Sequence, residues 1–134
     1  MQKIENMTKV FSKGSINEKK AIDNLSLSMD DDEFVTVIGG NGAGKSTLLN
    51  CISGVFPIDG GRILLDGTDI SRIPEYKRSV YIGRVFQDPL MGTAFDMTIE
   101  ENLAIACTKG KPRNLLPGIS KKAISVFREQ LALL

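Results

Sequence analysis

The residues best suited to chemistry lie in one glycine-rich run. In order, the run reads Gly39, Gly40, Asn41, Gly42, Ala43, Gly44, Lys45, Ser46 and Thr47. It satisfies the pattern G-x-x-x-x-G-K-[ST], which is typical of loops that bind phosphate groups. The glycines allow backbone N–H groups to curl around phosphate oxygens, because no Cβ atom stands in the way. The spacing therefore predicts a nucleotide phosphate site, with Gly39 and residues 41–47 as its binding residues.

The side chains that end the run would each make a different contact with the nucleotide. Lys45 can reach the β and γ phosphates as a mobile cation. Ser46 offers a hydroxyl group to Mg2+, a hard ion that prefers oxygen ligands. Thr47 is placed to bond a phosphate through its hydroxyl and N–H groups. A plain glycine turn before a helix is the alternative, but nucleotide binding is favoured because an apolar strand pattern precedes the loop.

Two elements must hold this loop in place. Residues 34–38 are almost continuously apolar and β-branched, which predicts a strand buried on both faces of a parallel sheet. From Lys45 onward, apolar residues recur at helical spacing until Gly54 and Pro57 end the pattern. The predicted helix points its positive N-terminus at the same anion that the loop would bind.

The remaining elements are expected to be short. Residues 1–11 predict a first strand, and the alternation over 25–29 predicts a half-buried second one. A strand is expected at 62–65, between turns at 59–61 and 66–67, and another strand at 82–86. A short helix is expected after Pro74, and a helix at 98–107 would be opened by a capping box of Thr98 and Glu101. A loop at 109–118 would lead to an amphipathic helix at 119–134.

Composition narrows the possible functions. The chain has 134 residues, with 17 Lys and Arg against 16 Asp and Glu, for a net charge of +1. This balance argues against a strongly basic nucleic-acid binder, so no nucleic acid is expected as a partner. The chain has no histidine, and Cys51 and Cys107 form no C-x-x-C pair, which excludes a Cys/His zinc site and a Ser-His-Asp triad. We expect a reducing compartment, with both thiols serving as small apolar residues.

No membrane span and no secretory signal are expected. No window holds about 18 uninterrupted apolar residues, which a spanning helix requires. The start of the chain carries charges throughout and lacks an apolar core.

The loop and its flanks together resemble the ATP-binding cassette (ABC) family. The resemblance spans most of the chain. Besides the loop, it rests on residues 9–11, 21–27 and 33–35 in the family's first strands, 60–67 in its antiparallel hairpin, 85–88 in its glutamine loop, and 97–103 at the start of its helical subdomain.

This resemblance implies an α/β fold with a P-loop NTPase core, an N-terminal antiparallel β subdomain and the start of a helical subdomain. Residues 1–134 would be the N-terminal part of one ABC ATP-binding domain. The expected parts are 1–33 as antiparallel β structure, 34–56 as the P-loop core, 57–90 from the hairpin to the glutamine loop, and 91–134 as the start of the helical subdomain.

The resemblance also implies roles for single residues and for partners. The Phe11 ring would stack on the adenine of ATP, the ordinary alternative being a core aromatic. Gln87 would contact Mg2+ or the attacking water, and would act with Lys45 in hydrolysis. The expected partners are transmembrane transporter subunits and a second ABC subunit in a head-to-tail dimer. Such a protein is cytoplasmic and peripheral on the inner face of the cell membrane.

Parts that this family needs for ATP hydrolysis are missing from the sequence. We find no strand that ends in Asp-Glu, no Leu-Ser-Gly-Gly-Gln signature and no switch histidine. All of these elements lie later in the family's chain, so residues 1–134 are expected to be the N-terminal half of a larger cassette. Its incomplete sheet would then expose apolar edges and favour self-association.

Four functions remain open at this point. The first is the ATPase subunit of a membrane transporter, which we favour for the parent protein. The second is an ABC-family ATPase with no transport role. A GTPase or kinase with a similar loop is the third, although no Asn-Lys-x-Asp guanine motif is present. The fourth is an inert nucleotide-binding fragment, which we favour for these 134 residues alone.

Overall fold

The computed structural model describes residues 1–110 and 119–132. The chain divides into two units, Met1–Ile82 and Gly83–Leu134, each of which is described by itself. This division falls earlier than the boundary expected between residues 90 and 91, and the four-part division of the domain stays a prediction.

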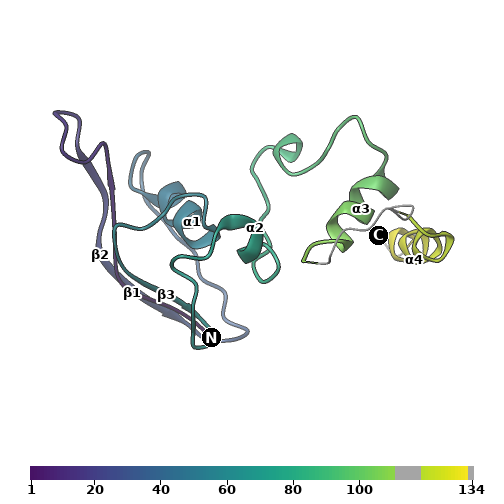
Figure 1. Cartoon of the computed structure of the whole chain (residues 1–134), viewed down its shortest axis with the longest axis horizontal. Coiled ribbons are helices and arrows are strands. Elements are labelled where there is room, and N and C mark those ends of the chain that lie inside the picture. Colours follow the sequence, from purple (N-terminus) through teal and green to yellow (C-terminus); the bar gives the residue numbers. More distant parts are fainter. Residues whose placement is uncertain (111–118, 133–134) are drawn as a thin grey trace. The chain divides into compact units, whose positions relative to one another are not determined.

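An antiparallel sheet forms the first unit (Figure 1). Its strands are β1 (Gln2–Phe11), β2 (Lys19–Met29), β3 (Gly60–Leu65) and β4 (Thr68–Asp69). They lie in the order β2-β1-β3-β4, and every neighbouring pair is antiparallel. The predicted first strand, second strand and hairpin are confirmed. Residues 25–29 alternate between half-buried and exposed, as their period-two pattern indicates.

Irregular pairing in β1 turns several of its residues toward one face. The register with β2 shifts between Ile4 and Met7, and again between Met7 and Lys9. Asn6 lies within the first shift with φ of 50°, a conformation that Asn tolerates better than most residues. Strict alternation would place Ile4 and Met7 on opposite faces, yet both are buried, and Lys9 is buried as well.

Helix α1 (Lys45–Ser53) packs on the sheet and completes its core. The buried cluster consists of Ile4, Met7, Ile22, Leu48, Cys51, Ile63 and Ile70. Cys51 is fully buried, and this burial raises the pKa of its thiol. Cys107, which we also expected to be a small apolar residue, is exposed. The helix ends as predicted at Gly54, which is left-handed with φ of 89°.

Arg78 joins the end of α1 to the chain that follows the hairpin. It is the last residue of the short helix α2 (Glu75–Arg78), and it is only 2% exposed. Its guanidinium donates to four carbonyl oxygens, those of Cys51 (2.9 Å), Ile52 (2.8 Å), Ser71 (2.8 Å) and Ile73 (2.7 Å). Two of these, Cys51 and Ile52, belong to the last turn of α1, and the Cys51 carbonyl also accepts from the N–H of the C-cap residue Gly54 at 3.2 Å. No feature of the sequence predicts this role.

Two predicted strands do not form. Residues 34–38 are not a strand, and Phe34 and Ile38 are 91% and 89% exposed. Residues 82–86 are not a strand either, and Val85 is 97% exposed. A strand needs a hydrogen-bonded neighbour, and no strand within residues 1–110 or 119–132 pairs with these segments. The predictions were wrong because apolar, β-branched composition indicates a strand without supplying its partners.

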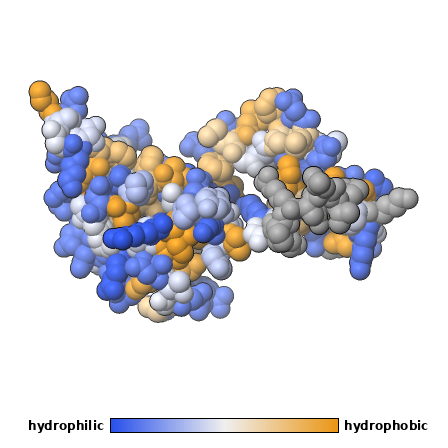
Figure 2. All heavy atoms as spheres, viewed as in Figure 1, coloured by the Kyte–Doolittle hydropathy of each residue, from blue (hydrophilic) through white to orange (hydrophobic). Residues whose placement is uncertain are grey.

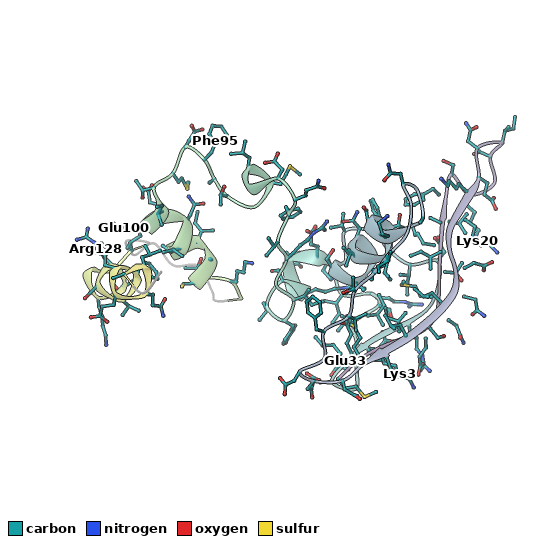
Figure 3. All side chains as sticks on the ribbon, turned by 180° about the vertical axis from the view of Figure 1, so that it is seen from behind. Lys3, Lys20, Glu33, Phe95, Glu100 and Arg128 are labelled. Carbon is teal, nitrogen blue, oxygen red and sulfur yellow. The ribbon has the colours of Figure 1, made fainter. Side chains whose placement is uncertain are left out.

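The second unit is helical. It contains the 3-10 helix η1 (Pro89–Met91) and the helices α3 (Ile99–Cys107) and α4 (Lys121–Leu131). The predicted capping box opens α3, with Thr98 accepting from the N–H of Glu101 and the Glu101 carboxylate accepting from the N–H of Thr98. Glu100 of α3 and Arg128 of α4 form an ion pair at 3.0 Å (Figure 3).

The fourth predicted helix starts slightly later than expected. Ser120 caps the N-terminus of α4, since its hydroxyl accepts from the N–H of Ala123. Residues 111–118, which make up most of the loop expected at 109–118, lie outside the described residues, as do residues 133–134.

Replacing Arg78 with methionine is expected to destabilise the first unit by about 3 kcal/mol. The substitution removes the guanidinium donor of four carbonyl groups in a largely buried site, of which the Cys51 carbonyl keeps its bond from the Gly54 N–H. Arg72→Met is the matched control, because Arg72 is exposed, and it should change the free energy of unfolding by less than about 0.5 kcal/mol. Urea unfolding followed by circular dichroism measures both, and equal effects would contradict the role of Arg78.

A polypeptide of these 134 residues is expected to self-associate in solution. Residues 34–38 expose apolar side chains in a segment without a described strand partner, and both features favour contacts between copies. Figure 2 shows further hydrophobic residues at the surface of both units. In analytical ultracentrifugation, Ile38→Lys should reduce association, whereas Ile16→Lys, in an exposed loop, should not. A monomeric wild-type polypeptide with a cooperative melt would contradict this expectation.

Candidate nucleotide-binding site

The glycine-rich loop leads directly into the first turn of α1. Gly44 is the N-cap residue of the helix and is left-handed, with φ of 87°. A Cβ atom at this position would lie 2.8 Å from the carbonyl oxygen of Ala21 in β2. Any larger residue would therefore strain the backbone and push the loop away from the sheet. The last glycine of the motif allows the loop to pack against β2 at the point where the helix begins.

Lys45 folds back over its own loop. Its ammonium group donates to the carbonyl oxygens of Gly39 at 2.5 Å and Gly40 at 2.7 Å. The side chain thereby bonds from the first residue of α1 to the first two residues of the loop, and its positive charge lies beside the backbone that would surround a phosphate. This arrangement fits a lysine that meets an anion in the loop.

The N-terminus of α1 is electrostatically suited to an anion. No side chain caps it, and no acidic residue lies in its first turn. The first N–H groups of any helix have no partner within the helix and carry the positive end of its dipole. In α1 no side-chain cap binds them. Ser46 is exposed and Thr47 is half-buried in this turn, which directly follows the loop. The residues that the motif singles out are thus brought together by one continuous segment.

Phe11 lies at the end of β1 with its ring half-buried. The ring of Phe56, from the segment between α1 and β3, packs against it edge to face, with centroids 5.3 Å apart and planes at 85°. Phe56 is held to α1 by the bond from its N–H to the carbonyl oxygen of Asn50 at 3.1 Å. Phe11 is consequently anchored to the same helix that carries the loop, although through the opposite end of that helix.

Lys9 and Asp59 form an ion pair beside Phe11. The Lys9 ammonium lies 3.2 Å from a carboxylate oxygen of Asp59 and 5.4 Å from the centroid of the Phe11 ring. The N–H of Val10 donates to the same carboxylate at 2.8 Å. This backbone bond, and then the Lys9 ammonium, lower the pKa of Asp59. Sequence reasoning missed the pair because its members are far apart in the chain, and only their places in a β1–β3 pairing could have suggested it.

Gln87 belongs to a different unit from the loop. It is exposed in the segment before η1, in the unit Gly83–Leu134, whereas Phe11 and residues 39–47 belong to Met1–Ile82. The structure therefore joins the predicted loop residues in one continuous segment and places Phe11 in the same unit, but it does not assign Gln87 to their surroundings.

Known proteins resemble the chain over most of its length. The family model described as "ABC transporter" matches residues 22–133. A tyrosine transport ATP-binding protein of Clostridioides difficile (strain R20291) is 48% identical over 115 residues, which cover 86% of this chain and 46% of that protein. An energy-coupling factor transporter ATP-binding protein of Clostridium acetobutylicum is 37% identical over 127 residues, which cover 92% of this chain and 41% of that protein.

Solved structures share the fold. The dimeric bacterial ABC transporter cassette MJ0796 has a TM-score of 0.76 and 26% identity, covering 98% of this chain and 56% of that chain. A nucleotide-free ATP-binding cassette from an ABC transporter has a TM-score of 0.67 and 33% identity, covering 97% of this chain and 46% of that chain. The expected P-loop fold, with its N-terminal antiparallel subdomain, is confirmed by these likenesses.

Two further findings bear on the chain as a whole. It spans less than half the length of the two curated relatives named above. Among residues 1–110 and 119–132, no helix combines the length and apolar character that crossing a bilayer requires. The glycine-rich loop, the strands around it and the match over residues 22–133 agree, and the chain belongs to the ABC transporter family.

Proposed function

We propose that this chain is part of the ATP-binding subunit of an ABC transporter, in which ATP binding and hydrolysis drive the passage of a solute across a membrane. The observation that carries the proposal is the closed loop at the start of α1, with Lys45 bonded across it to Gly39 and Gly40. The names of the curated relatives, both of which are transport ATP-binding proteins, support the same function.

The loop has the room and the donors that a triphosphate requires. A Cβ atom added at Gly40 or Gly42 would meet no other atom within 4 Å, so space lies open beside this backbone. The N–H groups of the loop and of the first turn of α1 would surround the phosphate oxygens. Lys45 would leave its carbonyl partners for the β and γ phosphates, and Thr47 would donate to a neighbouring oxygen.

Mg2+ fits the same site. The Ser46 hydroxyl is exposed in the first turn of α1 and is a hard oxygen ligand of the kind that this ion prefers. When bound, Mg2+ would neutralise charge on the phosphates. Gln87 is the second proposed ligand, because an amide oxygen can contact the ion or orient the attacking water without adding charge.

Phe11 would supply the contact with adenine. Its half-buried ring lies at the end of β1 and is anchored by Phe56, and the proposed contact uses ring surface that neither Phe56 nor Lys9 covers. Stacking on such a ring is tolerant of base identity and adds about 1–3 kcal/mol for nucleic acid bases. Lys45 and Gln87 are proposed to act in hydrolysis, and Phe11 only in binding.

The partners follow from the same proposal. A second ABC subunit would pair head to tail with this one, and transmembrane subunits would carry the solute, with the complex at the inner face of the cell membrane. One structural relative is described as a dimer bound to ADP and phosphate. The relatives named above are a tyrosine transport protein and an energy-coupling factor protein, so their names give no single solute to propose.

Lys45→Met is expected to weaken MgATP binding by about 10- to 100-fold, because it removes the only cation of the loop. Isothermal titration calorimetry of the full chain measures the dissociation constant. Lys3→Met is the matched control, since Lys3 is half-exposed and pairs with Glu5 at 2.8 Å. Equal affinities of the Lys45 variant and the wild-type protein would contradict the proposed phosphate site.

Association with a membrane partner tests the transport function separately. An affinity-tagged form of the protein that contains residues 1–134 together with the hydrolysis motifs missing from them should co-purify with integral membrane proteins from detergent-solubilised membranes. Phosphate release by that complex should fall at least tenfold in Gln87→Ala while MgATP binding is retained. An ATPase without a transport role would hydrolyse ATP and bring down no membrane protein. An inert nucleotide-binding chain would bind MgATP and release no phosphate.

A further inference from the structure

Lys9 is an unusual residue for its position. Among the described residues, only Lys9 and Arg78 are buried and charged. Lys9 is 8% exposed and lies in β1 on the face that also buries Met7. Removing an ammonium group from water is costly, and an apolar side chain of similar volume is often the more stable choice. The position therefore calls for a reason beyond packing.

The ammonium group of Lys9 is held by two different partners. A carboxylate oxygen of Asp59 lies 3.2 Å away, and the centroid of the Phe11 ring lies 5.4 Å away. The second distance is within the range of a cation–π interaction, which gains strength in a desolvated site. A single buried charge thus links an acidic group to the face of the aromatic ring at the end of β1.

Asp59 is itself fixed by the backbone of β1. Its carboxylate accepts from the N–H of Val10 at 2.8 Å, and its own N–H donates to the carbonyl oxygen of Thr8 at 2.9 Å. Asp59 is therefore tied to the strand on both sides of Lys9, by its carboxylate to Val10 and by its backbone to Thr8. Because these bonds leave Asp59 little freedom, the Lys9 ammonium and the Phe11 ring beside it are also restrained.

Phe11 is restrained from a second direction by Phe56. The two rings pack edge to face at 5.3 Å, and the chain at Phe56 is bonded to the last turn of α1. A ring whose side-chain torsions are already limited loses less conformational freedom when a flat ligand stacks on it. Lys9, Phe56 and Asp59 therefore all restrain the Phe11 ring, directly or through one another.

We propose that Lys9 and Asp59 are positioning residues that hold the Phe11 ring ready to stack on the base of a bound purine nucleotide. The proposal rests on the proposed function, since it assumes that a nucleotide occupies the loop. Lys9 touches neither phosphate nor base, and it acts through Phe11. Its substitution should thus affect ligands that carry a base and spare ligands that consist of phosphate alone.

The experiment compares two ligands on the full chain. MgATP and magnesium tripolyphosphate are titrated calorimetrically into the wild-type protein and into Lys9→Met, Lys9→Arg, Asp59→Asn and Phe11→Leu. Lys3→Met is the matched control, because Lys3 lies in the same strand and is also paired with an acidic residue, at 2.8 Å, but is half-exposed. Urea unfolding of each variant reports its stability independently of ligand.

Lys9→Met is expected to weaken MgATP binding about fivefold and to change tripolyphosphate binding by less than about twofold. Asp59→Asn should behave in the same direction, because it keeps the bond from Val10 but removes the charge that holds Lys9. Lys9→Arg retains a cation beside the ring and should recover most of the affinity. In the Phe11→Leu background, Lys9→Met should have no further effect on MgATP.

Other outcomes would overturn the inference. If Lys9→Met weakened the binding of MgATP and of tripolyphosphate equally, Lys9 would support the fold of the loop rather than the base contact. Asp59→Asn and Lys9→Arg allow the same comparison even where Lys9→Met is too unstable to titrate. Unchanged MgATP binding in all Lys9 variants would also overturn it. A wild-type protein that binds neither ligand would overturn the proposed function itself, whereas the former outcomes leave that function intact.

Discussion

The bonds of Arg78 to the last turn of α1 are the constraint on which the rest of the first unit depends. Helix α1 begins at the glycine-rich loop and ends at the carbonyl oxygens of Cys51 and Ile52, which Arg78 binds. A cation at the C-terminus of a helix complements the negative end of its dipole. The same guanidinium bonds to the carbonyl oxygens of Ile73 and Ser71, so polar contacts tie the helix to the segment that follows β4, in addition to its apolar packing on the sheet. Because the helix is held in this way, the glycine-rich loop at its N-terminus is held in position as well.

Two buried cations, Lys9 and Arg78, act on the buried thiol of Cys51. Lys9 and Arg78 each favour ionisation of the Cys51 thiol, yet burial has the larger effect and the thiol pKa is raised. A protonated, fully buried thiol is inert, which agrees with its role as a small core residue. Asp59, the only acidic partner of Lys9 among the described ion pairs, has a lowered pKa because the Val10 N–H and then Lys9 stabilise its charged form. The stabilisation by Asp59 is therefore complete above its unfolded pKa and is lost as the pH falls through its folded pKa.

Interactions between residues close together in the chain could be predicted from the sequence, whereas interactions between distant residues could not. The loop, the capping box of Thr98 and Glu101, and the end of α1 at Gly54 are encoded within a few residues, and each agrees with the structure. The strand at 34–38 depends on neighbours that no nearby residue supplies, and it does not form. Arg78 and the Lys9–Asp59 pair join residues that lie far apart in the chain, so no local pattern indicated them. The role of Gln87 depends on how the two units meet, which is likewise not a property of its neighbours in sequence.

The same distinction explains how the candidate site is built. The end of the loop is held by α1 and by the close approach of Gly44 to Ala21, both within the first unit. The start of the loop follows residues 34–38, which have no paired strand among the described residues, and the bonds from Lys45 to Gly39 and Gly40 tie it to the helix. A ligand that draws Lys45 away toward its phosphates would break these bonds, and its own contacts with the loop N–H groups would have to replace them. Any strand that paired with residues 34–38 would fix the start of the loop independently of Lys45, and would thereby lower the conformational cost of binding. The completeness of the sheet and the affinity of the loop are therefore coupled through one segment of backbone.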